Sequence, residues 1–161
     1  MSTDTTGGPP GQSGAARPLR IVLADDHGVV RRGLQLILDR EPDFEVVAEA
    51  GDVKSVKRQV RELQPDVLLL DLNMPGGSVL DAIPGLRTEA PGTAIVVLTM
   101  RDEPAIARAV LDAGARGYVI KEAADTELTL AIRQVAGGKR YLTRRLAGDL
   151  LADQILKGGW D

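Results

Sequence analysis

The sequence predicts an α/β protein built on a doubly wound parallel sheet, in which strands and helices alternate. Two observations favour this fold. Short apolar runs rich in Val, Ile and Leu alternate with longer segments whose apolar residues recur at helical spacing. The runs at 67–70 and 94–98 are apolar throughout, which is typical of parallel strands covered on both faces. The regular alternation therefore predicts helices on both sides of one parallel sheet.

Each expected element follows from apolar spacing and from the residues at its ends. Asp52 is placed to cap the second helix, and Gly114 follows the fourth helix as a natural C-cap. Pro84 lies inside the third helix and predicts a kink or a restart there. We expect strands at 19–24, 44–48, 67–70, 94–98 and 117–120, and helices at 28–40, 52–63, 78–88, 104–113 and 125–136.

Composition limits the classes of protein to which the chain can belong. It has 161 residues, a net charge of −3 and no cysteine, which excludes disulfides, cysteine-bound zinc and thiol catalysis. A charge so close to zero gives no support for nucleic-acid binding by this chain. No apolar run approaches the ~20 residues of a membrane-spanning helix, and the N-terminus lacks a secretory signal pattern. We therefore expect a cytoplasmic protein with no membrane contact.

The two ends of the chain differ from the central part. Residues 1–17 are rich in Gly, Ser, Thr and Pro with few apolar side chains, so we expect a disordered tail before a domain at 18–138. Residues 139–161 are expected to hold a linker helix at 143–156. Leu142, just before this helix, and Leu146 and Leu150 within it recur every four residues. Such a stripe either covers the domain's own surface or forms a linker or pairing helix, and both readings stay open.

Polar side chains follow four of the five expected strands. Asp25 and Asp26 come after the first strand, Asp71 after the third, Thr99 after the fourth and Lys121 after the fifth. Taken singly, each has an ordinary explanation as a helix cap, a loop acid or a surface charge. Because the carboxyl ends of parallel strands meet at one edge of the sheet, their joint placement predicts a single site.

The chemistry of this set points to a cation and a phosphoryl group. Three neighbouring carboxylates repel one another and raise each other's pKa, and a divalent cation relieves that conflict. Oxygen ligands favour Mg²⁺ or Mn²⁺ over zinc. A carboxylate can then attack phosphorus to form an acyl phosphate, with Thr99 and Lys121 holding the charge on the transferred oxygens. His27, the single histidine, is expected to be solvated at a helix start and is given no role.

Four strings in the chain, IVLADDH, LLLDLNMPGG, IVVLTM and GARGYVIKEA, resemble the receiver domains of two-component response regulators. The resemblance covers residues 19–138 and implies a flavodoxin-like (βα)5 fold with five strands in the order 2-1-3-4-5. It implies a phosphoprotein whose Asp71 takes a phosphoryl group from a sensor histidine kinase. The further implied roles are direct Mg²⁺ ligands at Asp26, Asp71 and the Asn73 backbone carbonyl, a metal-bound water on Asp25, and phosphoryl contacts from Thr99 and Lys121.

The same resemblance implies a conformational switch and an output. Tyr118 matches the switch aromatic, whose rotamer follows Thr99. The resemblance also implies a homodimer, formed through the fourth helix, fifth strand and fifth helix or through the C-terminal helix. The strings look most like the NarL/FixJ branch, whose LuxR-type helix-turn-helix controls transcription. We expect that domain to be missing here, in an excised receiver, so that DNA is reached only through it. The loop lacks the usual Gly before Leu80, and Lys121-Glu122 replaces the usual Lys-Pro.

Four other readings compete with a phosphorylated regulator of transcription. One is a stand-alone receiver, and another is a pseudo-receiver that binds proteins and never takes phosphate. A phosphatase of the haloacid dehalogenase kind would need Asp-x-Asp, where this chain has Asn73. A flavodoxin-like cofactor binder would need a phosphate-binding loop where Asp25 and Asp26 stand. We expect no enzyme beyond catalysis of the chain's own phosphorylation and dephosphorylation.

Overall fold

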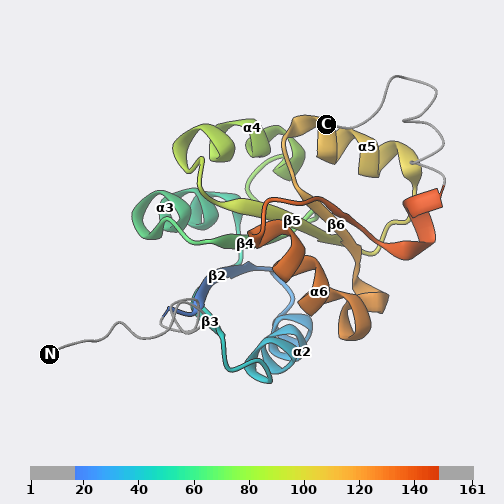
Figure 1. The fold of residues 1–161 in the computed structure, drawn as a ribbon. Coiled ribbons are helices and arrows are strands. Elements are labelled where there is room, and N and C mark those ends of the chain that lie inside the picture. The colour runs from blue at the N-terminus through green and yellow to red at the C-terminus, as the bar shows by residue number, and fades with distance from the viewer. Residues whose placement is uncertain (1–16, 149–161) are drawn as a thin grey trace, which may run out of the picture.

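The computed structural model describes residues 17–148, which form one parallel sheet with helices on both faces (Figure 1). The strands are β2 (Leu19–Ala24), β3 (Phe44–Ala50), β4 (Val67–Asp71), β5 (Ala94–Thr99), β6 (Gly117–Ile120) and β7 (Tyr141–Leu142). The helices are α2 (Gly28–Asp39), α3 (Val53–Leu63), α4 (Val79–Glu89), α5 (Pro104–Ala113) and α6 (Ala124–Ala136), with a 3₁₀ turn η2 at Lys121–Ala123. None of these helices is both long enough and apolar enough to cross a membrane.

The sheet has the order β3-β2-β4-β5-β6-β7, and its first five strands confirm the predicted order 2-1-3-4-5. The prediction of five strands was wrong by one, because β7 pairs in parallel with β6 through Gly117↔Tyr141 and Tyr118↔Leu142. With only two residues, β7 gives no apolar run from which a strand could be predicted. It lies inside 139–161, the segment predicted to be a linker helix.

A buried carboxylate holds β7 and the residues after it against α6. Glu127 of α6 is almost fully buried and accepts hydrogen bonds from the Tyr141 hydroxyl at 2.7 Å and the Thr143 hydroxyl at 3.0 Å. The backbone N–H of Arg144 donates to the same oxygen at 3.3 Å. Residues 144–148 then begin a helix, and the remainder of the helix predicted at 143–156 lies outside the described residues.

Two apolar cores cover the two faces of the sheet. Along β2, Ile21 and Leu23 pack into one cluster with residues of α2 and α6, while Val22 and Ala24 pack into the other with residues of α3, α4 and α5. Figure 1 shows the same division of the helices between the faces. Strands β4, β5 and β6 are buried along their whole length, as the unbroken apolar runs predicted. The polar groups at the strand ends are thus held on a rigid base.

Helix ends follow the predicted caps, but Pro84 does not divide its helix. The Asp52 carboxylate accepts from the Ser55 N–H at 2.7 Å, and Gly114 ends α5 with a φ of 125°. Helix α4 continues through Pro84 without a restart, so that part of the prediction was wrong. Buried Ile83 and Leu86 on either side of the proline anchor the helix to the core, and this packing outweighs one missing hydrogen bond.

Arg17 is the first described residue, although it was predicted to belong to the tail. Its guanidinium makes two hydrogen bonds of 3.0 Å with the Asp66 carboxylate, just before β4. The same carboxylate accepts from the Arg20 backbone N–H at 2.8 Å. The rest of the predicted tail, residues 1–16, lies outside the described part of the chain.

Candidate functional site

The carboxyl ends of β2, β4 and β6 bring two buried carboxylates to one ammonium group. Asp25 directly follows β2, where its N–H donates to the Ala50 carbonyl, and Asp71 is the last residue of β4. Lys121 follows β6, and its Nζ lies 2.8 Å from Asp25 Oδ2 and 3.2 Å from Asp71 Oδ2. The side chain of Lys121 is only 10% exposed, so this charge is directed inward. The structure therefore brings together three residues that the sequence placed at separate strand ends.

Asp26 and His27 complete a cluster that could hold a metal ion. One ligand atom from each of Asp25, Asp26, His27 and Asp71 lies within 4.8 Å of all the others. Asp25 Oδ2 and Asp71 Oδ2 are buried, and among the described residues the Lys121 ammonium is the group that faces both of them. Buried oxygens of this kind are normally satisfied by a donor or a cation. One ammonium does not balance three carboxylates, and carboxylate oxygens gathered in this way fit a hard divalent cation.

His27 is the member of this cluster to which the sequence assigned no role. Its Nδ1 lies 3.1 Å from Asp26 Oδ1 and 3.5 Å from Asp25 Oδ1, while its side chain remains 63% exposed. Its backbone N–H also donates to Asp25 Oδ1 at 2.8 Å, which fixes the turn before α2. Direct adjacency to two aspartates was the only signal for this position in the sequence.

Burial sets the electrostatics of Asp71. Desolvation raises the pKa of its carboxyl, partly opposed by the hydrogen bond from the Asn73 N–H and the charge of Lys121, while the Asp25 carboxylate adds to the rise. The Asn73 N–H donates to Asp71 Oδ1 at 3.1 Å, so the loop after β4 is tied to this carboxylate. The charged form of Asp71 thus needs additional positive charge nearby, which a bound cation would supply.

Thr99 and Tyr118 meet at the backbone of Arg101. Thr99 ends β5 and is fully buried beside the Asp71 end of β4, where Asp71 pairs with Leu98. Its Oγ1 accepts from the Arg101 N–H at 3.1 Å, and the hydroxyl of buried Tyr118 donates to the Arg101 carbonyl at 2.6 Å. Burial also raises the pKa of Tyr118 to about 12, so the phenol keeps its proton at neutral pH. One peptide segment therefore links the two residues predicted to switch.

A further connection reaches this edge from the segment after β7. Arg145 lies 3.1 Å from Asp102 in the loop after β5 and 3.1 Å from Glu122, the residue after Lys121. Leu146 is buried in the same apolar cluster as Tyr118. These contacts could not be predicted from the sequence, because they join positions 23 and 43 residues apart.

The chain matches known proteins over most of its length. Residues 21–133 match the family model of the response regulator receiver domain. The oxygen regulatory protein NreC of Staphylococcus aureus strain JH9 is 42% identical over 144 residues, which is 89% of this chain and 66% of NreC. The chain therefore spans just under two thirds of the length of such relatives.

Solved structures agree in fold and in branch. A LuxR-family two-component response regulator from Aurantimonas sp. SI85-9A1 has a TM-score of 0.80 and 34% identity, covering 86% of this chain and 99% of that one. The isolated receiver domain of RcsB from Salmonella enterica serovar Typhimurium, in the presence of phosphomimetic BeF3-, has a TM-score of 0.75 and 32% identity, covering 81% and 97%. The chain belongs to the response regulator receiver domain family, in its NarL/LuxR branch.

Proposed function

We propose that this receiver domain accepts a phosphoryl group on Asp71 from a sensor histidine kinase, in a reaction that requires Mg²⁺ or, in its place, Mn²⁺. The observation that carries the proposal is the buried Asp71 carboxylate, with Lys121 Nζ 3.2 Å away and the ligand atoms of Asp25 and Asp26 within 4.8 Å. Asp25 shares this burial, this ammonium and this neighbourhood. The resemblance to receiver domains, in which the acid of the LLLDLNMPGG string is the acceptor, selects Asp71 between the two. The domain occupies residues 18–138, in a cytoplasmic protein.

The carboxylates and the β4 loop would hold the cation. Asp26, Asp71 and the Asn73 backbone carbonyl would be its direct ligands, and Asp25 would contact it through water. The buried oxygens of Asp25 and Asp71, which share a single ammonium, support this set. When bound, the cation supplies positive charge to the phosphoryl oxygens and lets Asp71 stay ionised.

The transfer itself needs little movement of protein groups. An Asp71 oxygen forms a bond to phosphorus as the bond from phosphorus to the donor's leaving atom breaks, and that atom keeps the electron pair. Lys121 is poised beside Asp71 and can follow the new oxygens as a charge-assisted donor. Thr99 can release Arg101 and donate its hydroxyl to the same group. The product is an aspartyl phosphate with about −1.5 to −2 charge.

Coupling to the surface would run through Arg101. Movement of Thr99 toward the phosphoryl group shifts the loop whose carbonyl accepts from Tyr118. The face made by α5, β6 and α6 then changes and pairs with a second copy, either there or through the C-terminal segment 139–161. Control of transcription would follow through a LuxR-type helix-turn-helix domain, which also supplies all contact with DNA.

Mass spectrometry with a small phosphodonor tests the proposal. The protein is incubated with acetyl phosphate and Mg²⁺, and we expect the intact mass to rise by one phosphoryl group. Asp71→Asn should not gain that mass, while Asp39→Asn, an exposed aspartate on α2, should label like the parent. Labelling of Asp71→Asn, or a parent that stays unlabelled with this donor and with a kinase of the same class, would overturn the proposal and favour a pseudo-receiver.

A further inference from the structure

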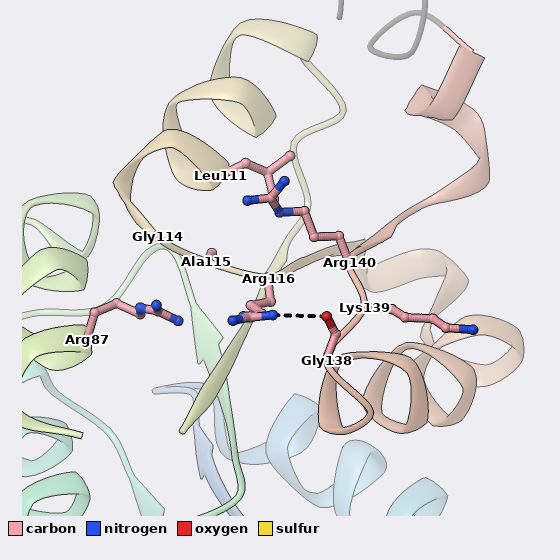
Figure 2. Close-up of a pocket in the computed structure, with 8 residues that line it drawn as sticks. All are labelled: Arg87, Leu111, Gly114, Ala115, Arg116, Gly138, Lys139 and Arg140. Atoms are coloured by element: carbon pink, nitrogen blue, oxygen red, sulfur yellow. Dashed lines mark hydrogen bonds between the residues drawn. The ribbon is translucent and has the colours of Figure 1, made fainter. Parts of the chain in front are cut away.

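A cavity of about 530 Å³ lies at the opposite edge of the sheet, where β6 and β7 begin (Figure 2). Cations are prominent among its lining residues, which include no carboxylate although the chain as a whole has a charge of −3. A smaller hollow of about 180 Å³ shares Arg87, Arg116 and Gly138 with it and is likewise free of acids. The residues that line the larger cavity are Arg87, Leu111, Gly114, Ala115, Arg116, Gly138, Lys139 and Arg140.

The side chains of Arg87 and Arg116 lie against the backbone around the cavity. The side chain of Arg87 crosses Gly114, where an added Cβ would approach Arg87 Cγ to 2.9 Å. Arg116 Nη1 donates to the Gly138 carbonyl at 3.1 Å, which uses one of its five N–H donors. Figure 2 shows the two side chains pointing toward each other across the cavity. Two guanidinium groups that face each other repel, and an anion bound between them lowers their electrostatic free energy.

The positions of the helix ends explain why cations gather here, but not why the donors of Arg87 and Lys139 have no partner in the described part of the chain. Helices α4, α5 and α6 all end near the cavity, and cations are favoured at the carbonyl ends of helices. The guanidinium of Arg87 and the ammonium of Lys139 make no hydrogen bond or ion pair with any residue in the described range 17–148. Their donors, and those that Arg116 keeps, remain available to a ligand.

We propose that this cavity binds a small anion carrying at least two phosphate groups, of the nucleoside diphosphate class. Its volume lies within the ~300–1,000 Å³ typical of small-molecule sites. Arg87, Arg116 and Lys139 would contact the phosphates, for which planar guanidinium groups are well suited. Leu111 and buried Ala115 provide an apolar wall for the carbon-rich part of the ligand. A concave site of this size suits a small molecule better than the outside of a nucleic-acid duplex.

This site does not depend on phosphorylation of Asp71. Arg116 and Lys121 flank β6, so they are separated by five steps along an extended strand, on the order of 16 Å at ~3.3 Å per residue. That distance exceeds the Debye length of about 8–10 Å at ordinary salt, which weakens any electrostatic coupling between exposed groups. Binding at this cavity can therefore be measured in a protein whose Asp71 has been replaced.

Titration calorimetry with ADP and inorganic pyrophosphate, in EDTA and 0.1 M salt, tests the proposal. We expect saturable binding of both, no binding of adenosine, and the same affinity in Asp71→Asn. Arg87→Gln and Arg116→Gln should each weaken binding by about tenfold or more, because each removes a charged donor. Arg32→Gln, an exposed arginine on α2 with the same change in charge, should bind like the parent.

The opposite results are equally clear. Absence of saturable binding to either probe by a folded parent protein would overturn the proposal. So would an equal loss in Arg32→Gln, which would indicate general charge attraction. Binding of a 20-base-pair DNA duplex that Arg116→Gln abolishes, with no binding of ADP, would identify a nucleic-acid surface instead. Lys139→Gln, checked by circular dichroism, provides a further variant in case Arg116→Gln fails to fold.

Discussion

At the carboxyl edge of the sheet three aspartates lie close together and two of them face one lysine, whereas at the amino edge Arg87, Arg116 and Lys139 line a cavity without any carboxylate. The two edges share the same strands, and β6 connects them directly, with Arg116 before it and Lys121 after it. The comparison shows that strand direction in this parallel sheet places acidic residues at one edge and basic residues at the other. One edge is suited to a cation and a phosphoryl group, and the other to an anion.

The largest effect is expected from removing the inward charge at the carboxyl edge. Lys121→Gln should slow labelling by acetyl phosphate by roughly 10²–10³-fold, the usual cost of losing one donor to a developing oxyanion. Lys139→Gln removes a lysine from the amino edge and should leave the rate unchanged. Rates from intact-mass time courses give both values. Equal slowing in the two variants would show that net charge matters more than position.

The second effect concerns the cation and the pH dependence of Asp71. Because burial raises the pKa of Asp71 in the folded protein, its ionisation disfavours the fold, and this penalty is absent below the unfolded pKa of about 3.9. The penalty grows as pH rises from the unfolded pKa to the folded pKa and is constant above it. In EDTA, Asp71→Asn should therefore have a larger free energy of unfolding than the parent at neutral pH, with the two converging near pH 3.

Added Mg²⁺ should reverse that order. At a concentration of about 100 times its Kd, Mg²⁺ stabilises the parent by about 2.7 kcal/mol, and this gain should be much smaller in Asp71→Asn. Urea unfolding with and without Mg²⁺ measures the difference, with Asp39→Asn as the control. If the parent and Asp71→Asn gained the same stability from Mg²⁺, the cation would have to bind elsewhere.

The third effect tests strand β7, which pairs with β6. Glu127→Ala leaves the donors of Tyr141, Thr143 and Arg144 without their acceptor, which should cost about 2 kcal/mol in the free energy of unfolding. Glu62→Ala, at an exposed position of α3, should cost much less. Hydrogen exchange at the Tyr141 amide should rise in the first variant. Unchanged exchange would mean that β7 is held by its backbone pairing alone.

A smaller effect is expected at Gly114, where the amino edge depends on a backbone with positive φ. Gly114→Ala places a Cβ 2.9 Å from Arg87 Cγ at a φ of 125°, so stability should fall by about 1 kcal/mol or more and Arg87 should move. Gly33→Ala, in open space within α2, should instead stabilise by about 0.5–1 kcal/mol. Thermal unfolding of both variants measures whether each substitution lowers or raises stability. A gain in stability for Gly114→Ala would contradict the backbone assignment.

The smallest effect belongs to Arg145. Its two ion pairs join side chains that are each about half exposed, and such pairs contribute about 0–1 kcal/mol. Arg145→Gln should therefore change the free energy of unfolding by less than about 1 kcal/mol, and high salt should remove the difference. A loss well beyond this range would show that Arg145 holds the two loops together.

The carboxyl edge could be predicted from the sequence because each of its residues stands directly after a strand. Asp25, Asp71, Thr99 and Lys121 follow runs whose apolar pattern is strong, and parallel pairing then brings their positions together. The caps at Asp52 and Gly114 were predictable for the same reason, since capping is a local property. Local pattern and strand direction were sufficient at this edge.

The remaining features depend on contacts between distant positions. Strand β7 has two residues and is held by Glu127, a glutamate whose burial no sequence pattern indicated. Arg87 reaches the amino-edge cavity from α4, and Arg116 enters it through the loop before β6. Pro84 misled the prediction, because the energy of burying Ile83 and Leu86 is visible only once the helix is packed. Side-chain packing determines these features, and the periodicity of the sequence carries no information about that packing.

The most direct test of the central claim is to map the phosphoryl group after labelling with acetyl phosphate. Reduction of an aspartyl phosphate by borohydride converts that aspartate to homoserine, which peptide mass spectrometry locates. We predict homoserine at position 71 alone, formed with Mg²⁺ present and absent when EDTA replaces it. Homoserine at another position, or equal conversion in EDTA, would contradict the account of the carboxyl edge as a cation-dependent phosphoryl acceptor.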